Sequence, residues 1–405
     1  MEKKVNSIHT RAVHAGDRKP TSGSRFIPVT TPIHTATTYF YQDAADLERV
    51  FSGEITGPNY SRHGNPTNEA LEELLASLES GAGALACSSG MAALHLAIVT
   101  ALADRNKVIL AASALYGATI NMLTKVLEPF GIETVFADFC DEAAVARAIA
   151  EHKPGALLME TISNPLLRVA PLDRIAALAR DAGAQLIVDS TFSTPLITRP
   201  LEFGADYTVQ SLTKYLSGHG DVLGGAVITN EANLEQLRML ARSLGPLLGP
   251  FEAYLTMRGI KSFPVRMERQ CSNACRIASW LATHPAVERV YFPADPKHPD
   301  AASIKRLFAP NLFGAIVSFE VKGSFAGESA QAAIFRLMNA LRLIIPATSL
   351  GDVQSMISYS AMSSHRELSP KHRERLGIRD NLLRVSVGIE SVDDIIADLD
   401  QALGA

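Results

Sequence analysis

Between residues 65 and 230, hydrophobic and polar positions alternate as helical stretches and short apolar runs. Asn65 can cap a first helix and Pro66 fits its first turn, after which leucines recur on one helical face. Apolar runs follow at 84–87, 107–112, 133–137, 156–159, 185–188, 207–209 and 225–229. Such runs are typical of strands buried on both faces of a largely parallel sheet that helices flank. The pattern therefore predicts a seven-stranded α/β core.

The two ends of the chain differ from this core. Residues 1–60 are rich in Thr, Pro, Ser and Gly and show little periodicity, which predicts an extended arm. Beyond about residue 256 the pattern predicts a helix at 265–283, strands at 315–320 and 384–387, and a closing helix from Val392. We therefore expect three parts: the arm at 1–60, a central domain at 61–255 and a smaller C-terminal α/β domain at 256–405.

Composition narrows the class of function. The 405 residues are 47% hydrophobic, which allows a large core, and the net charge of −4 gives no electrostatic reason to expect nucleic acid as a partner. The start lacks the apolar segment of a signal peptide, and the longest apolar run, at 91–103, is shorter than the ~20 residues that span a bilayer. We expect a cytoplasmic protein that acts on a small molecule, without membrane or nucleic-acid partners.

The cysteines give no sign of a metal or a disulfide framework. Only four are scattered over the chain, so we expect free thiols. Cys271 and Cys275 have helical rather than zinc-binding spacing. We therefore expect no metal site.

In an open α/β sheet, ligands bind beyond the carboxyl ends of the strands, so polar residues that end the predicted strands are candidates for chemistry. Ser88-Ser89-Gly90-Met91 follows the first strand and opens a helix, where backbone N–H groups and the helix dipole can hold a phosphate. The alternative is a small-residue turn that serves packing only. Asp189 ends another strand, either as an ion-pair or capping residue or as the partner of a pyridine nitrogen.

The segment Ser211-Leu212-Thr213-Lys214-Tyr215 ends a further strand and runs into the glycine-rich loop 218–221. Lys214 is placed for a Schiff base, and Ser211 and Thr213 for a phosphate. A lone lysine at a strand end is by default solvated. The combination with Asp189 and the helix-opening serine-glycine turn favours a cofactor site.

Three more residues end or occupy predicted strands. Tyr116 follows the strand at 107–112 and can stack on a flat cofactor, although a core tyrosine is an equal alternative. Asn164, in Ser163-Asn164-Pro165, is a candidate ligand or a plain turn residue. Arg384 lies in an apolar strand, where it either closes an internal ion pair or grips a substrate carboxylate.

Together these motifs resemble the pyridoxal-phosphate enzymes of cysteine and methionine metabolism, a group that includes cystathionine γ-synthase, cystathionine γ-lyase, methionine γ-lyase and the homoserine-ester sulfhydrylases. The resemblance covers nearly the whole chain. Its most specific pieces are Tyr60-Ser61-Arg62 leading to Asn65-Pro66-Thr67, the segment 211–215 with Gly218-His219-Gly220-Asp221, and Ser386-Val387-Gly388-Ile389-Glu390. It implies an aspartate-aminotransferase-like fold with pyridoxal 5'-phosphate (PLP) in the domain at 61–255.

The resemblance also implies roles for single residues. Lys214 would form the Schiff base and transfer protons, and Tyr116 would stack on the ring and act as an acid. Asp189 would pair with the ring nitrogen. The resemblance further implies a homotetramer of two active dimers, in which Tyr60 and Arg62 would reach the phosphate of a neighbouring subunit. This contact would give the extended arm at 1–60 a role in joining the subunits. Further assignments are Ser89, Gly90, Met91, Ser211 and Thr213 to the phosphate, and Asn164, Ser349 and Arg384 to the α-carboxylate of an amino-acid substrate.

Within the family the subgroup stays open between a methionine or cystathionine γ-lyase, a γ-replacing cystathionine γ-synthase and an O-acyl-homoserine sulfhydrylase. Ala118 stands where methionine γ-lyases usually carry cysteine, and Thr348 where cystathionine enzymes often carry glutamate. The segment 364–370 is most similar to O-succinylhomoserine sulfhydrylases, whereas 218–221 is more similar to the lyases. We rank the γ-lyase slightly ahead.

Other classes predict different contexts. Ser211 and Lys214 also match the Ser-x-x-Lys motif of some serine hydrolases, in which the serine stands at the start of a helix. The glycines at 81 and 83 suggest a nicotinamide-dependent enzyme, but they follow a helix and precede a strand, the reverse of a dinucleotide fingerprint. A non-catalytic binding module is the third alternative.

Overall fold

The computed structural model describes residues 6–19, 25–322, 329–362, 366, 373 and 377–404. It divides into two compact units. Unit 1 is built from Met1–Thr100 and Asp206–Pro264, and unit 2 from Ala101–Ala205 and Val265–Ala405. The boundaries near residues 60 and 255 that the sequence predicts stay predictions.

All seven strands predicted for the core are confirmed. They are β1 Gly83–Cys87, β2 Val108–Ala112, β3 Glu133–Ala137, β4 Ala156–Glu160, β5 Gln185–Asp189, β6 Tyr207–Ser211 and β7 Gly225–Thr229. They form one sheet in the order β1-β7-β6-β5-β4-β2-β3. In unit 2, β2 pairs in parallel with β3 and β4, and β4 with β5; in unit 1, β7 lies antiparallel between β1 and β6. The predicted α/β class with a mostly parallel sheet is therefore correct.

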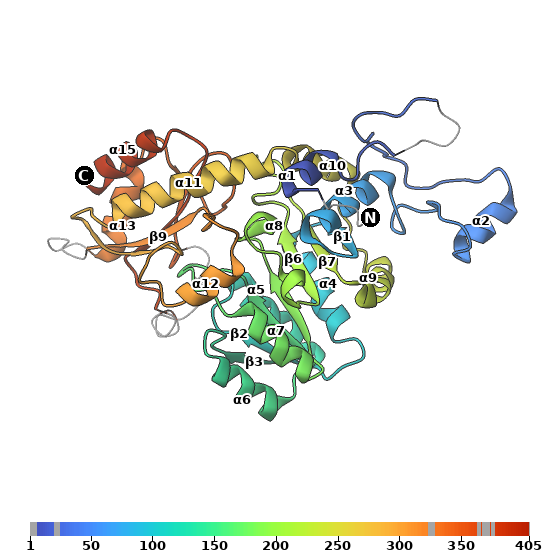
Figure 1. The fold of residues 1–405 in the computed structure, drawn as a ribbon, viewed down its shortest axis with the longest axis horizontal. Coiled ribbons are helices and arrows are strands. Elements are labelled where there is room, and N and C mark those ends of the chain that lie inside the picture. Colours follow the sequence, from blue (N-terminus) through green and yellow to red (C-terminus); the bar gives the residue numbers. More distant parts are fainter. Residues whose placement is uncertain are drawn as a thin grey trace. The chain divides into compact units, whose positions relative to one another are not determined.

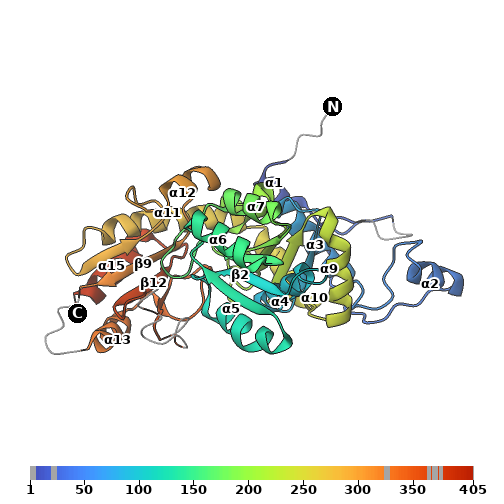
Figure 2. The same ribbon diagram turned by 90° about the horizontal axis from the view of Figure 1, so that it is seen from below.

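The helices of unit 1 begin with the arm, where the structure has two short helices that the sequence pattern did not predict. The predicted cap at Asn65 is confirmed, because its side chain accepts a hydrogen bond from the N–H of Thr67. Helix α2 stands away from the rest of unit 1 (Figures 1 and 2). The helices are α1 Ile8–His14, α2 Ala44–Phe51, α3 Pro66–Glu79, α4 Gly90–Ala101, α9 Glu231–Leu244 and α10 Pro250–Ile260.

The helices of unit 2 cover its part of the large sheet. Helices α6 and α7 lie side by side there (Figure 2). The helical elements are α5 Gly117–Asn121, a π-helix at Met122–Leu127, α6 Glu142–His152, α7 Leu172–Asp181, α8 Thr194–Ile197 and two short 3-10 turns at Glu128–Phe130 and Pro200–Phe203.

The C-terminal part of unit 2 has its own sheet and core. Strands β8 Val287–Tyr291, β9 Ile316–Val321, β10 Ile345–Pro346, β11 Met356–Tyr359 and β12 Leu382–Ser386 form a five-stranded sheet in the order β10-β11-β12-β9-β8. Helices α11 Phe263–Leu281, α13 Ala330–Ala340 and α15 Val392–Leu403 lie beside this sheet (Figure 1). Each of them supplies buried apolar side chains to its core. A further helix, α12, spans Ala301–Leu307. The predicted α/β domain, two of its strands and its long and closing helices are confirmed.

Three expectations from the sequence can be compared with the described part of the chain. All four cysteines are free thiols. Among the residues that the structure describes, no group of three or more His, Cys, Asp or Glu side chains is arranged to hold a metal ion. No helix in that part of the chain combines the length and apolar character that a bilayer span requires.

Candidate active site

In unit 1, the turn between β1 and α4 packs tightly against the ends of β6 and β7. A Cβ added to Gly90 would lie 3.1 Å from the Cβ of Ser211, and one added to Gly225 would overlap the backbone oxygen of Ser89. The side chain of Ser89 accepts a 3.1 Å hydrogen bond from the N–H of Ala92 and so caps α4. The first N–H groups of a helix have no acceptor within it and, with the helix dipole, favour an anion.

The turn after β6 carries Thr213 and Lys214. The N–H of Lys214 donates to the backbone oxygen of Ser211 at 3.2 Å. The hydroxyl of Thr213 accepts from the N–H of Gly224 at 3.0 Å and lies 3.2 Å from its oxygen, to which it can donate. Ser211 is the last residue of a strand and does not open a helix, which argues against a Ser-x-x-Lys hydrolase.

In unit 2, two carboxyl groups stand side by side at the ends of β4 and β5. Glu160 and Asp189 are partners in the parallel register, so their side chains point to the same face of the sheet. One oxygen of Asp189 accepts from the N–H of Thr191 at 3.0 Å and from its hydroxyl at 2.6 Å. Burial and the charge of Asp189 raise the pKa of Glu160 to about 8, and burial raises the pKa of Asp189.

Glu160 holds the backbone of two predicted site residues. Its Oε1 accepts from the N–H of Tyr116 at 2.7 Å, and its Oε2 from the N–H of Asn164 at 3.3 Å. Tyr116 precedes α5 and is 42% exposed, which excludes the alternative of a core tyrosine.

Arg384 lies on β12 and is 4% exposed. Its Nη1 donates to the side-chain oxygen of Asn164 at 3.0 Å, its Nη2 donates to the backbone oxygen of Ser349 at 3.4 Å, and its guanidinium lies 6.0 Å from the ring centre of Phe192. The structure therefore brings together the three residues predicted for the substrate carboxylate. The backbone oxygen of Ser349 makes this contact.

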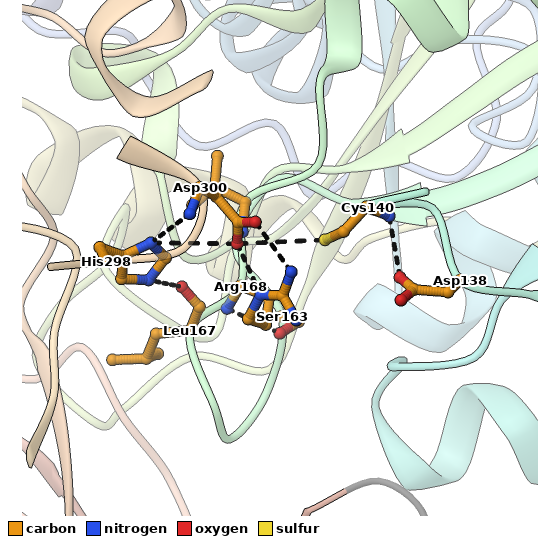
Figure 3. A network of polar contacts seen from close by, with 8 residues as sticks. Asp138, Cys140, Ser163, Leu167, Arg168, His298 and Asp300 are labelled. Atoms are coloured by element: carbon orange, nitrogen blue, oxygen red, sulfur yellow. Dashed lines mark hydrogen bonds and ion pairs between the residues drawn. The ribbon is translucent and has the colours of Figure 1, made fainter. Parts of the chain in front are cut away.

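The loop that carries Asn164 is anchored by a polar network (Figure 3). Asp300, whose side chain is 8% exposed, accepts two hydrogen bonds from Arg168, at 2.7 and 2.8 Å, and one from the N–H of Val169 at 2.9 Å. His298 Nε2 lies 3.2 Å from the backbone oxygen of Leu167, and its Nδ1 accepts from the N–H of Asp300 at 3.1 Å. Burial raises the pKa of the Cys140 thiol beside Asp300 to about 12, so this cysteine is not an activated nucleophile.

The remaining predicted residues lie in unit 1. Met91 is the second residue of α4. Tyr60 is 42% exposed, and the guanidinium of Arg62 lies 5.6 Å from the centre of its ring and donates to the backbone oxygen of Arg242. Most of the segment 364–370 lies outside the described residues.

Sequence reasoning missed Glu160. The predicted strand ended with the apolar run at 156–159, one residue before Glu160. Because an acid that follows such a run is usually solvated, the pattern did not indicate Glu160 as a candidate. The usable signal was that two neighbouring strands each end in an acid, since parallel strands align their carboxyl ends.

The comparisons with known proteins show the family of the chain. A family model described as Cys/Met metabolism PLP-dependent enzyme matches residues 9–404. The chain belongs to this family. It is 40% identical to an L-methionine γ-lyase of Fusobacterium nucleatum subsp. polymorphum, over 100% of this chain and 99% of that protein. It is 37% identical to the O-succinylhomoserine sulfhydrylase of Pseudomonas aeruginosa, over 98% and 96%.

A solved structure gives the same fold. Cystathionine γ-synthase from Xanthomonas oryzae pv. oryzae, in complex with cystathionine, matches with a TM-score of 0.89 at 36% identity, and the match covers 98% of each chain. The chain is therefore a PLP-dependent enzyme of sulfur amino-acid metabolism, and the aspartate-aminotransferase-like architecture is correct. Membership of the family also excludes the nicotinamide-dependent enzyme and the non-catalytic module.

The described side chains fit the cofactor chemically. Unit 1 offers the N-terminus of α4 and two hydroxyls, which suit a phosphate. Unit 2 offers an acid for a ring nitrogen and an exposed aromatic ring. The turn at Gly90 is tight, since an added Cβ would lie 3.1 Å from the Cβ of Ser211, and so close an approach of backbone suits a phosphate cradle.

Proposed function

We propose that Lys214 binds PLP covalently and that Ser89, Gly90, Met91, Ser211 and Thr213 hold its phosphate. Asp189 keeps the ring nitrogen protonated, and Tyr116 stacks on the ring. Asn164, Ser349 and Arg384 bind the α-carboxylate of the amino acid. The contacts of Arg384 with Asn164 and Ser349 support this last assignment, because they fix the direction of a buried guanidinium whose planar fork suits a carboxylate.

For the reaction, we propose cleavage of the bond between Cγ and sulfur of methionine or cystathionine, which releases 2-oxobutyrate, ammonia and a thiol. When bound, PLP withdraws electrons from Cα and so makes its proton acidic. Lys214 Nζ takes this proton and then one from Cβ, and the Tyr116 hydroxyl gives a proton to the departing sulfur. Water hydrolyses the remaining unsaturated product to 2-oxobutyrate and ammonia. The carboxylate grip of Arg384 holds one end of the substrate and so limits the orientations that Cα can take.

The observation that carries this choice is the full-length similarity to a methionine γ-lyase. A second candidate is γ-replacement, in which a thiol adds at Cγ of an acyl homoserine; the similarity to a sulfhydrylase over 98% of the chain favours it. Both candidates use the same lysine, carboxylate grip and acid.

One experiment separates them. The protein is offered methionine, cystathionine, and O-acetyl and O-succinyl homoserine, each with and without a thiol, and 2-oxobutyrate is followed. We expect keto-acid release from methionine or cystathionine alone. Dependence on an acyl ester plus a thiol would instead assign the protein to the replacing enzymes.

Lys214→Ala tests the shared part of the proposal. We expect turnover to fall by on the order of 1000-fold or more, because the variant loses both the covalent attachment and the proton carrier. Borohydride reduction followed by peptide mass analysis should find the cofactor on residue 214 in the parent protein. Attachment at any other lysine would contradict the assignment, and Lys19→Ala, an exposed lysine paired with Glu73, serves as the control.

For assembly, we propose a cytoplasmic homotetramer of two active dimers, in which Tyr60 and Arg62 reach the phosphate of a neighbouring subunit. Exposed apolar side chains on the arm support this, since Phe40 is 88% exposed and Phe51 66%. Light scattering should give four times the monomer mass. Arg62→Ala should weaken PLP binding if the clasp is correct.

A further inference from the structure

Glu160 is an ionisable side chain that the proposed reaction leaves without a role. It ends β4, and both of its carboxyl oxygens accept hydrogen bonds. The partner of each oxygen is the backbone of a residue with a proposed role, Tyr116 on one side and Asn164 on the other. One side chain therefore ties the proposed ring-stacking residue to the proposed carboxylate site.

The link continues beyond Asn164. While its N–H is held by Glu160, its side-chain oxygen accepts from Arg384 Nη1 at 3.0 Å. A shift of Glu160 would therefore move the acceptor that orients the guanidinium. The loop on the other side of Asn164 is fixed separately, by Asp300 and His298 (Figure 3). The hydroxyl of Ser318 also donates to the backbone oxygen of Pro165 at 2.7 Å.

The charges around Glu160 decide its protonation. The groups that face it are Asp189 on β5, Arg384 on β12, and the N–H groups of Tyr116 and Asn164. With one cation near two adjacent carboxyl groups, ionisation of the second carboxyl group is unfavourable once the first is charged. Asp189 receives a short hydroxyl bond and an N–H bond from Thr191 on a single oxygen, and both favour its ionised form.

We propose that Glu160 is a positioning residue that fixes Tyr116 and Asn164 with one carboxyl group, and that it carries a proton beside an ionised Asp189. The proton lets both acids occupy adjacent strand ends without paired negative charge. A positive ring nitrogen next to Asp189 would then favour the ionised form of Glu160. PLP binding would therefore release a fraction of one proton per protein molecule. This inference rests on the proposed roles of Asp189, Tyr116 and Asn164.

The test compares the parent protein with Glu160→Gln, Glu160→Ala and a matched control, Glu320→Gln. Glu320 is 1% exposed and forms hydrogen bonds with Tyr291 and Arg379. Glu320→Gln therefore shows how neutralising a buried glutamate elsewhere in unit 2 changes the measured proton exchange. PLP binding to each apoprotein is measured by calorimetry in buffers of different ionisation enthalpy, which gives the protons exchanged.

We expect the parent protein and Glu320→Gln to release more protons than Glu160→Gln just below pH 8, the pKa of Glu160 being about 8. In steady-state kinetics, Glu160→Gln should raise KM for the amino acid less than Glu160→Ala does, because its amide oxygen can still accept from one of the two N–H groups, although its NH2 group cannot accept from the other. Glu160→Ala should raise KM about tenfold or more with a smaller change in kcat.

Two results would overturn the inference while the proposed function stands: Glu160→Gln that binds PLP with the proton release of the parent protein, or Glu160→Ala with an unchanged KM. If Glu160→Ala does not fold, the proton balance of Glu160→Gln still decides. A parent protein that does not attach PLP to Lys214 overturns the proposed function as well.

Discussion

Unit 1 and unit 2 present opposite chemistry at the carboxyl ends of their strands. In unit 1, the groups around Ser89, Gly90 and Ser211 are backbone N–H groups and hydroxyls, packed so closely that glycine is required. In unit 2, two acids and an arginine are arranged at the ends of β4, β5 and on β12. Unit 1 suits a permanent anion held by neutral dipoles, whereas unit 2 must control where protons reside. The two regions should therefore respond differently to substitutions that change shape and to those that change charge.

Among the substitutions that compare the two units, the largest effect is expected from removing charge in unit 2. Asp189→Asn keeps the shape but cannot stabilise a protonated ring nitrogen, so kcat/KM should fall by on the order of 100-fold. Steady-state kinetics at saturating PLP measure this loss. Asp181→Asn, at the exposed end of α7, is the control. A variant of Asp189 with full activity would show that the acid is only a structural partner of Thr191.

A smaller effect is expected from adding volume in unit 1. In Gly90→Ala the new Cβ would lie 3.1 Å from the Cβ of Ser211 and 3.2 Å from its hydroxyl, so Ser211 must shift. We expect the Kd for PLP to rise about tenfold, a loss of about 1.4 kcal/mol. Because alanine is a better helix former than glycine, stability should change little.

Fluorescence titration of the apoprotein with PLP gives the Kd of this variant. Gly404→Ala is the control, since its Cβ would meet nothing closer than 3.5 Å. An unchanged Kd in Gly90→Ala would mean that the turn is a packing feature only, which is the alternative that the sequence left open.

Much of the large sheet could be predicted because strands buried on both faces leave continuous apolar runs. The smaller sheet was harder. Strand β8 has exposed charged residues at Glu288 and Arg289, and β10 contains only Ile345 and Pro346, so neither gives a clear period. Their pairing is decided by tertiary contacts rather than by local pattern.

The candidate residues could be predicted because each follows an apolar run, but their interactions could not. The register that sets Glu160 beside Asp189 exists only once β4 and β5 pair. The bond from Arg384 to Asn164 joins residues 220 positions apart. Sequence reasoning therefore identified the types of group and missed the side chain that links them.

The smallest effect on catalysis is expected from the anchor of the Asn164 loop. Asp300→Asn replaces a carboxylate that accepts hydrogen bonds from Arg168 and Val169. We expect it to lower the free energy of unfolding by about 2 kcal/mol, a value that allows for solvent screening of the ion pair because Arg168 is 36% exposed. KM should rise only a few fold, since Glu160 still holds Asn164. Asp173→Asn is the control, because its pair with Arg306 has similar geometry but 34% and 37% exposure, and it should cost less than about 1 kcal/mol.

The effect of Asp300→Asn depends on pH in a defined direction. Although burial opposes it, hydrogen bonds from Arg168 and Val169 hold the pKa of Asp300 below its ordinary value in the folded protein. Its contribution to stability is therefore present above the unfolded pKa of about 4 and is lost as pH falls through the lower folded value. Urea unfolding of the parent protein and Asp300→Asn should differ at pH 7 and converge progressively below pH ~4. A gap that stays constant on acidification would mean that Asp300 acts through its shape and not through its charge.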